Sequence, residues 1–175
     1  NENIAIGNAA LGTGDVSGHG NIALGKQALV AMTGGHNNIG IGLTAGDALL
    51  TGTDNIAIGR LSLSATTDGA DNIAIGRSAL AVSADDADNN IAIGTTAMGA
   101  SDVSGTHNIA LGTDSMDAIT SGACNIAIGK DALGAAVTGN LNVAIGYGAL
   151  KTNADDGGDY NIAIGYLAMD TCTGA

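Results

Sequence analysis

The sequence predicts an all-β fold: a parallel β-solenoid of about ten coils, each 17–19 residues long. Two observations predict it. The segment Asn-Ile-Ala-Ile-Gly returns with small variations along the whole chain, and two glycines punctuate almost every period. A period this short cannot hold a pair of helices, and apolar residues that alternate with a small residue are typical of a strand.

Each period begins at an asparagine. It continues with Ile or Val, Ala or Gly, Ile or Leu, and Gly; two variable residues, Ala or Ser, and usually Leu or Met follow. Residues 1–175 thus form a single repeat domain, and because the chain begins inside a repeat we expect it to be a fragment of a longer protein. The ten coils start near Asn3, Asn21, Asn38, Asn55, Asn72, Asn90, Asn108, Asn125, Asn142 and Asn161.

The repeat assigns a structure to each part of a coil. Asn-Ile-Ala-Ile is expected to form one strand, and a shorter second strand is expected in the Ala-Leu stretch. The glycine after the strand, and another three residues before the next asparagine, are expected at corners that need positive φ or close backbone approach. Coils about 4.8 Å apart would stack the asparagine amides into a hydrogen-bonded ladder. This structural ladder is predicted for Asn21, Asn38, Asn55, Asn72, Asn90, Asn108, Asn125 and Asn142.

The central residue of the strand is alanine in nine coils and glycine in one, Gly40. We expect both aliphatic residues of a strand, such as Ile56 and Ile58, to point into the coil, and Ala57 to point outward. A solvated position would vary among polar residues, so a constant alanine predicts a face that is covered by another chain. The chain interface is therefore predicted at Ala23, Ala57, Ala74, Ala92, Ala110, Ala127, Ala144 and Ala163.

The motif N-I-A-I-G-x-x-A-L resembles the V-A-I-G repeats in the heads of trimeric autotransporter adhesins (YadA-like heads). It is still closer to the A-I-G-x-x-A-L repeats of phage tail-fibre proteins. The resemblance covers all ten periods. It implies a left-handed β-roll, three chains around one axis, and a place on a virion or a bacterial surface. The coils of adhesin heads are shorter, so the additional residues are expected in an outer loop.

Composition and charge exclude several classes of function. The chain has no Phe, Trp or Pro and a net charge of −12. Such acidity argues against a nucleic-acid partner and against anionic membranes, and no apolar run is long enough to insert into a bilayer. Because no Ser-His-Asp set, phosphate loop or Cys-x-x-Cys pair is found, we expect no enzymatic activity.

The combined prediction is a rigid, homotrimeric, extracellular fibre segment of an attachment protein, in a phage tail fibre or a bacterial surface adhesin. One alternative is a self-assembling extracellular filament subunit, because uncapped coils can stack end to end. A weaker alternative is a monomeric solenoid that binds ice or another regular surface. Any contact with a host glycan or protein receptor is expected at the few aromatic residues: Tyr147, Tyr160 and Tyr166, with Lys151 nearby.

Four of the five basic residues follow the strand glycine directly. They form either a stripe that faces an acidic glycan or an ordinary solvated face; the second interpretation is favoured. The four residues are Lys26, Arg60, Arg77 and Lys130.

No cofactor is expected. The acidic loops 85–88 and 155–159 offer oxygen ligands for calcium, but the spacing of known calcium loops is absent, so solvated loops are preferred. His19 and His36 share a coil position, with His107 one residue off it, and two such histidines are too few for a zinc site. The two cysteines lie almost three coils apart, beyond disulfide distance, and are expected to be free thiols: Cys124 and Cys172.

Overall fold

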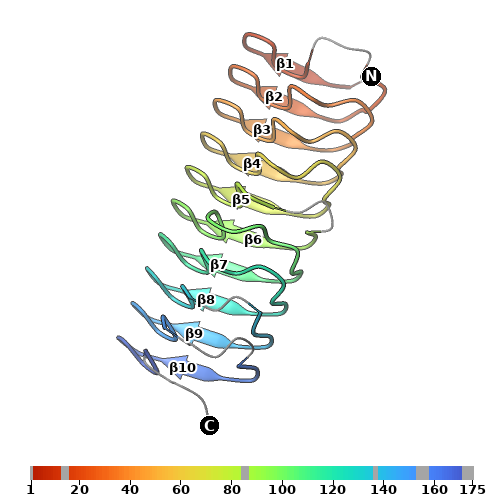
Figure 1. Ribbon diagram of the computed structural model, residues 1–175. Helices are drawn as coiled ribbons and strands as arrows, with labels where there is room; N and C mark the ends of the chain where they lie inside the picture. Colours follow the sequence, from red (N-terminus) through yellow and green to blue (C-terminus); the bar gives the residue numbers. More distant parts are fainter. Residues whose placement is uncertain (1, 13–15, 84–86, 136–137, 153–157, 171–175) are drawn as a thin grey trace.

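The computed structural model describes residues 2–12, 16–83, 87–135, 138–152 and 158–170. The chain winds into a stack of coils, and each coil adds one three-residue strand to a single parallel sheet (Figure 1). The predicted parallel β-solenoid is thus confirmed. The strands are β1 (Ile4–Ile6), β2 (Ile22–Leu24), β3 (Ile39–Ile41), β4 (Ile56–Ile58), β5 (Ile73–Ile75), β6 (Ile91–Ile93), β7 (Ile109–Leu111), β8 (Ile126–Ile128), β9 (Val143–Ile145) and β10 (Ile162–Ile164).

Neighbouring strands pair in register, so equivalent residues stack directly on one another. Ala57, for example, pairs with Ala74, and Ile58 pairs with Ile75. At about 4.8 Å per step, β1 and β10 lie roughly 43 Å apart, at opposite ends of the stack. Within the described part of the chain there is no helix, and so none that could cross a membrane.

The asparagines form a continuous ladder inside the stack. The Oδ1 atom of Asn55 accepts hydrogen bonds from the backbone N–H of Asn72 at 3.0 Å and from its Nδ2 atom at 3.2 Å. The Nδ2 atom of Asn55 donates to the carbonyl of Gly69 at 2.7 Å. The Oδ1-to-backbone bond recurs at every step from Asn3 to Asn161. All eight asparagines predicted for the ladder are buried.

The predicted direction of the strand side chains is wrong. Ala57 is fully buried within a single chain, whereas Ile56 and Ile58 are only half-buried on the opposite face. Because side chains alternate along a strand, the buried asparagine and the alanine two residues later share the inner face. The alanines therefore line the coil interior and do not face another chain. This correction applies to Ala23, Ala57, Ala74, Ala92, Ala110, Ala127, Ala144 and Ala163.

The coil interior is narrow, which explains the small central residue. The alanines pack against the buried Ala or Ser and the Leu or Met that follow the strand, such as Ala28 and Leu29. At Gly40 even alanine would be crowded, because a Cβ atom there would lie 2.7 Å from Cγ of Leu29. Gly46 replaces the usual Leu or Met in the same coil, and its Cβ atom would meet Cδ2 of Leu29 at the same distance. Two glycines thus accommodate one large side chain of the preceding coil.

The Ala-Leu stretch is a turn in the described coils, and the predicted second strand is wrong. The turn contains two left-handed residues, for example Gln27 with φ 58° and Leu29 with φ 50°. Its backbone still bonds from coil to coil: the N–H of Gln27 donates to the carbonyl of Asn8 at 2.8 Å. The segment therefore stacks as closely as a strand does, but with a conformation that reverses the chain.

The two glycine corners have different causes. The glycine after the strand has a positive φ in every coil, 130° at Gly59, where a Cβ atom would lie 2.5 Å from the carbonyl oxygen of Gly76. The second glycine does not need positive φ. At Gly52 a Cβ atom would lie 2.6 Å from the carbonyl oxygen of Gly69, so close stacking alone excludes a side chain there.

Replacing one ladder asparagine tests the energetic weight of the ladder. Asn55→Ala leaves the buried N–H of Asn72 and the carbonyl of Gly69 without their side-chain partners. We expect a loss of about 2–5 kcal/mol in the free energy of unfolding, measured by denaturation at fixed protein concentration. The control Thr51→Ala, exposed on an outer loop, should change it by less than about 0.5 kcal/mol. Equal losses in the two variants would contradict a stabilising ladder.

Candidate functional site

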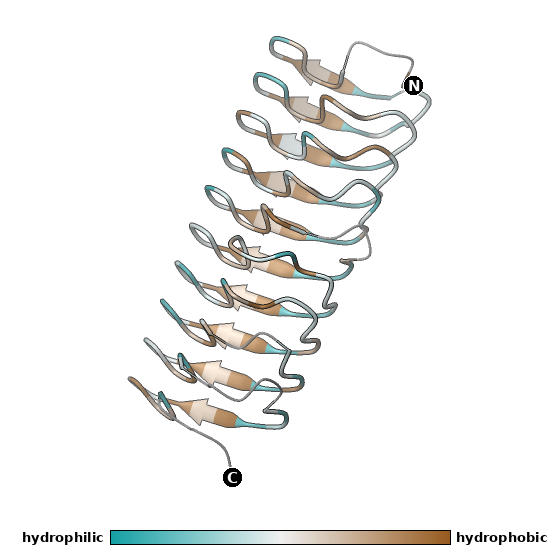
Figure 2. Ribbon diagram, viewed as in Figure 1, coloured by the Kyte–Doolittle hydropathy of each residue, from teal (hydrophilic) through white to brown (hydrophobic). Residues whose placement is uncertain are grey.

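The outer surface of the sheet is apolar along its whole length. We call the first and third residues of strands β1–β10 the isoleucine face; all are Ile, Leu or Val, and none is buried in the single chain. Their side chains are 41% exposed at Leu24, 42% at Leu111 and 36% at Ile128. Figure 2 shows these residues as brown segments of successive strands that follow one another down the stack. A continuous apolar surface of this kind marks an interaction site.

Two columns border the isoleucine face, one at each end of the strands. The post-glycine column follows the strand glycine, and all of its residues are exposed or half-exposed. Backbone bonds such as that from the N–H of Ser78 to the carbonyl of Arg60, 2.9 Å, hold successive coils in register there. The column consists of Asn8, Lys26, Leu43, Arg60, Arg77, Thr95, Thr113, Lys130, Tyr147 and Tyr166.

The pre-asparagine column lies at the opposite end of the strands, one residue before each ladder asparagine. Apart from Glu2, its members have positive φ, which suits Asn, Asp and Gly best. All except Gly20, which is half-exposed, are exposed. The column consists of Glu2, Gly20, Asn37, Asp54, Asp71, Asn89, His107, Cys124, Leu141 and Tyr160.

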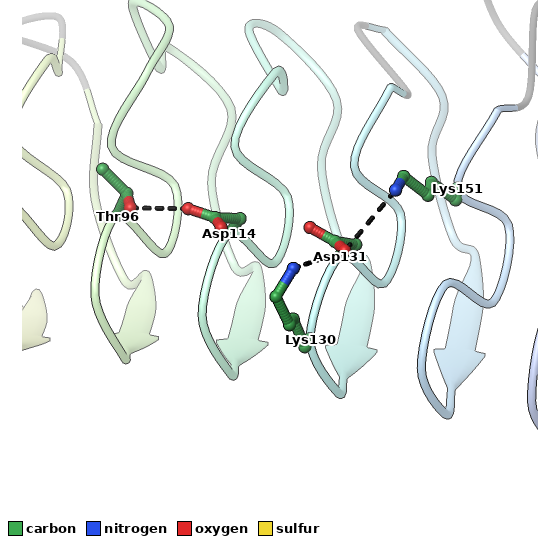
Figure 3. Close-up of polar contacts among 5 residues, drawn as sticks. All are labelled: Thr96, Asp114, Lys130, Asp131 and Lys151. Atoms are coloured by element: carbon green, nitrogen blue, oxygen red, sulfur yellow. Dashed lines mark hydrogen bonds and ion pairs between the residues drawn. The ribbon is translucent and has the colours of Figure 1, made fainter.

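A polar cluster lies on the turns of coils six to nine (Figure 3). The Oγ1 atom of Thr96 donates to Oδ1 of Asp114 at 2.6 Å. Two lysines reach Asp131: Nζ of Lys130 lies 2.7 Å from its Oδ2 atom, and Nζ of Lys151 lies 3.4 Å from the same atom. Lys130 and Lys151 therefore share one carboxylate as their partner within the chain. The predicted role of Lys151 in ligand contact has to compete with this ion pair.

Two aspartates in and beside this cluster have pKa values shifted in opposite directions. Burial, reinforced by the nearby Asp114 and Asp131, raises the pKa of Asp117 above its ordinary value. The hydrogen bond from Lys130 lowers the pKa of Asp131. Asp47 occupies the same coil position as Asp117, and burial likewise raises its pKa.

The three tyrosines do not form one cluster within the chain. Tyr147 and Tyr166 stack in adjacent coils, with ring centroids 5.4 Å apart and ring planes 14° from parallel. Lys130 extends this row, because its Nζ atom lies 5.7 Å from the Tyr147 ring centroid. Tyr160 belongs to the other column, at the opposite end of β10, and is 75% exposed. Sequence position alone placed Tyr160 beside Tyr166 because only five residues separate them.

His19 and His36, which share a coil position, are in contact. The rings of His19 and His36 lie 4.3 Å apart, and Nδ1 of His36 accepts a hydrogen bond from the backbone N–H of His19. His107 contacts Thr106 through its Nδ1 atom. Among the residues the structure describes, no group of three or more His, Cys, Asp or Glu side chains is arranged to hold a metal ion.

The acidic loops and the cysteines are only partly within the described residues. Asp88 accepts a hydrogen bond from the backbone N–H of Ala70, and Asp159 accepts one from that of Asn140. These two carboxylates therefore bind the preceding coil. Cys124 is a free, exposed thiol. The remaining residues of these predictions lie outside the described ranges: Asp85, Asp86, Asp155, Asp156 and Cys172.

The opposite pKa shifts predict opposite effects of two neutral substitutions. A carboxyl group with a raised pKa destabilises the fold once pH exceeds that pKa, so Asp117→Asn should raise the melting temperature at pH 7. Asp131 has a lowered pKa and contributes stability above its unfolded-state value, so Asp131→Asn should cost up to about 1 kcal/mol at pH 7.

Thermal melts at pH 7 and at pH 3 check both signs. Each difference from the parent should shrink at pH 3, because Asp117 is then largely protonated and Asp131 begins to protonate in the unfolded chain. Destabilisation by Asp117→Asn at pH 7 would contradict the assignment.

Comparison with protein-family models, with curated proteins and with solved structures returns no match. The family resemblance of the repeat therefore stays an expectation. The features that bear on function are the fold, the isoleucine face and the two columns that border it.

Proposed function

We propose that the chain is a rigid segment of an extracellular attachment fibre, in which three copies pack their isoleucine faces around an axis parallel to the stack. The observation that supports this best is the isoleucine face itself. The proposal retains the trimeric assembly expected from the sequence. Its interface consists of the residues on either side of each alanine, and not of the alanines themselves.

The apolar surface is hard to explain in an isolated chain. Each coil presents two branched aliphatic side chains to solvent along the full length of the sheet. Covering the exposed part of each would contribute up to about 1–2 kcal/mol. The coil interior, by comparison, is filled by alanines and only one or two larger side chains per coil. Association therefore supplies a substantial part of the buried apolar area.

The spacing of the face favours a copy of the same chain as the partner. Equivalent isoleucines repeat once per coil, about 4.8 Å apart. A surface with the same repeat matches this spacing along the whole stack, and a second copy has it by construction. The number of three chains and a left-handed winding follow from the resemblance to adhesin heads and tail fibres.

Such an assembly suits a spacer that carries an attachment function at a distance. Ladder and backbone hydrogen bonds join each described coil to the next, which gives an elongated structure that resists bending. We place it on a virion tail fibre or a bacterial cell surface, without enzymatic activity. Contact with a host glycan or protein receptor is secondary to this role, because Lys151 is already paired with Asp131. The residues expected for such contact are Tyr147, Tyr160, Tyr166 and Lys151.

Charged substitutions separate the interface from the core. Ile75→Asp with Ile93→Asp places two stacked carboxylates in the proposed interface. Light scattering should give the parent three times the 16.8 kDa chain mass and this variant a smaller mass, because buried unpaired charges cost several kcal/mol. The parent's melting temperature should also rise with protein concentration.

The control Ser104→Asp with Ser121→Asp lies on the exposed loops of coils six and seven and should keep the parent's mass. A monomeric parent, or an isoleucine variant that keeps the mass of three chains, would overturn the proposal.

A further inference from the structure

The two columns that border the isoleucine face carry opposite charges in two adjacent coils. In coil four the pre-asparagine residue is Asp54 and the post-glycine residue is Arg60; in coil five they are Asp71 and Arg77. All four side chains are exposed. Among the described residues neither arginine has an ion pair, although the lysines near Asp131 do. An acidic rod thus leaves its two arginines unpaired, each with a carboxylate at the far end of its own strand.

The match continues with apolar residues at the other end of the stack. Coil nine has Leu141 before the asparagine and Tyr147 after the glycine, 46% and 43% exposed. Coil ten has Tyr160 and Tyr166, each 75% exposed. Both Leu141 and Tyr160 have positive φ, 58° and 61°. Large side chains are unfavourable in that conformation, so their presence needs a reason that the single chain does not supply.

These partners cannot meet within one chain. Each pair is separated by the ladder asparagine, a three-residue strand and a glycine, and a strand alone spans about 10 Å. Rotation about an axis parallel to the stack changes the arrangement. When two chains are related by such a rotation, the pre-asparagine edge of one lies beside the post-glycine edge of the next. Equivalent coils then lie at the same level along the stack, because a rotation has no translation along its axis.

We infer that neighbouring copies pair level by level, with each pre-asparagine residue of one chain against the post-glycine residue of the same coil in the next. The inference rests on the proposed assembly and specifies its register. Asp54 and Asp71 bind Arg60 and Arg77 of the adjacent copy, and Leu141 and Tyr160 pack on Tyr147 and Tyr166. The aromatic cluster expected from the sequence re-forms across the interface between chains.

Other registers match less well. A shift of one coil in one direction pairs Asp54 with Arg77 and Glu2 with Lys26, but it sets Asp71 against Thr95. A shift in the other direction leaves Asp71 with Arg60 and sets Asp54 against Leu43. Only the same-coil register forms both Asp–Arg pairs. Antiparallel rods would set like columns against each other and form none of these pairs.

The two columns can specify the register between chains, which the isoleucine face alone cannot. Nearly identical residues recur at every coil, so a slip of one coil would cost the apolar face little beyond its ends. Registers are weakly specified on such uniform surfaces, and proteins fix them with a few polar or charged pairs. The edge pairs therefore align the chains, and the isoleucine face holds them together.

A native cysteine provides the test. Cys124 occupies the pre-asparagine position of coil eight, and Lys130 occupies the post-glycine position of the same coil. In a Cys172→Ser background, Lys130→Cys should form disulfides between chains under mild oxidation. Non-reducing gels should then show most of the protein as covalently linked dimers and trimers. Thr95→Cys, two coils away, would lie about 10 Å off level, beyond the ~7 Å limit, and should stay monomeric on the gel.

Charge substitutions give a second readout. Arg77→Asp sets two acidic columns against each other and should lower the melting temperature at low salt; adding Asp71→Arg should recover most of that loss.

The outcomes separate this inference from the proposed function. A parent of three-chain mass in which Thr95→Cys cross-links and Lys130→Cys does not would overturn the same-level pairing and leave the assembly intact. Absence of cross-links in both variants, together with no recovery by Asp71→Arg, would overturn it as well. A parent that is monomeric by light scattering would overturn the assembly itself.

Discussion

The ladder asparagines lie inside the stack, repeat at the coil spacing and bond each coil to the next. Each ladder residue accepts from the backbone N–H of the next asparagine and donates to a carbonyl of the following corner. This arrangement fixes the inner face of the strand. Alternation then places the alanine inside with the asparagine and turns both aliphatic residues outward. The apolar outer surface, and with it the proposed assembly, follows from the direction of one buried polar side chain.

The same stacking stabilises backbone conformations that would be unfavourable in an isolated coil. Described coils carry two or three non-glycine residues with positive φ, as at Leu61, Leu63 and Asp71. Each costs roughly 1–2 kcal/mol for an ordinary side chain. Their N–H groups bond to the preceding coil or, at Leu63, to the following one; that of Asp71 donates to the carbonyl of Thr53 at 3.1 Å. The strained turns are therefore held by neighbours of the same shape, which explains why the repeat tolerates little variation at its corners.

The repeat predicted much of this architecture because period and glycine spacing report backbone geometry directly. The parallel solenoid, the coil starts and the two corners follow from them. The direction of the side chains did not follow, because large aliphatic residues were assumed to fill the interior. A signal was present: asparagine and alanine are two residues apart, both nearly constant and both small, as a narrow interior requires. The turn at Ala-Leu was missed because left-handed Leu, as at Leu29 with φ 50°, has no signature in composition.

The sequence alone also did not predict which residues lie together at the edges of the isoleucine face. In the sequence, Asp71 and Arg77 look like isolated surface charges. In the folded chain they lie at the two edges of one apolar face. Lys130 and Lys151 resemble them in sequence, but both form an ion pair with Asp131. The distinction depends on which turn residues the fold brings together. The proposed function accordingly rests on surfaces that extend along the stack, with charged and apolar residues at their edges.

The central claim is that the isoleucine face is covered by other copies of the chain, and thiol accessibility tests it most directly. In a background of Cys124→Ser and Cys172→Ser, single cysteines would replace Ile75, which is half-buried in the isolated chain, and Ser104, which is exposed on an outer loop. The account predicts that the thiol at position 104 reacts rapidly with a polar reagent. The thiol at position 75 should stay protected until dilution or mild denaturant separates the chains. Equal reaction rates at the two positions in the native protein would contradict it.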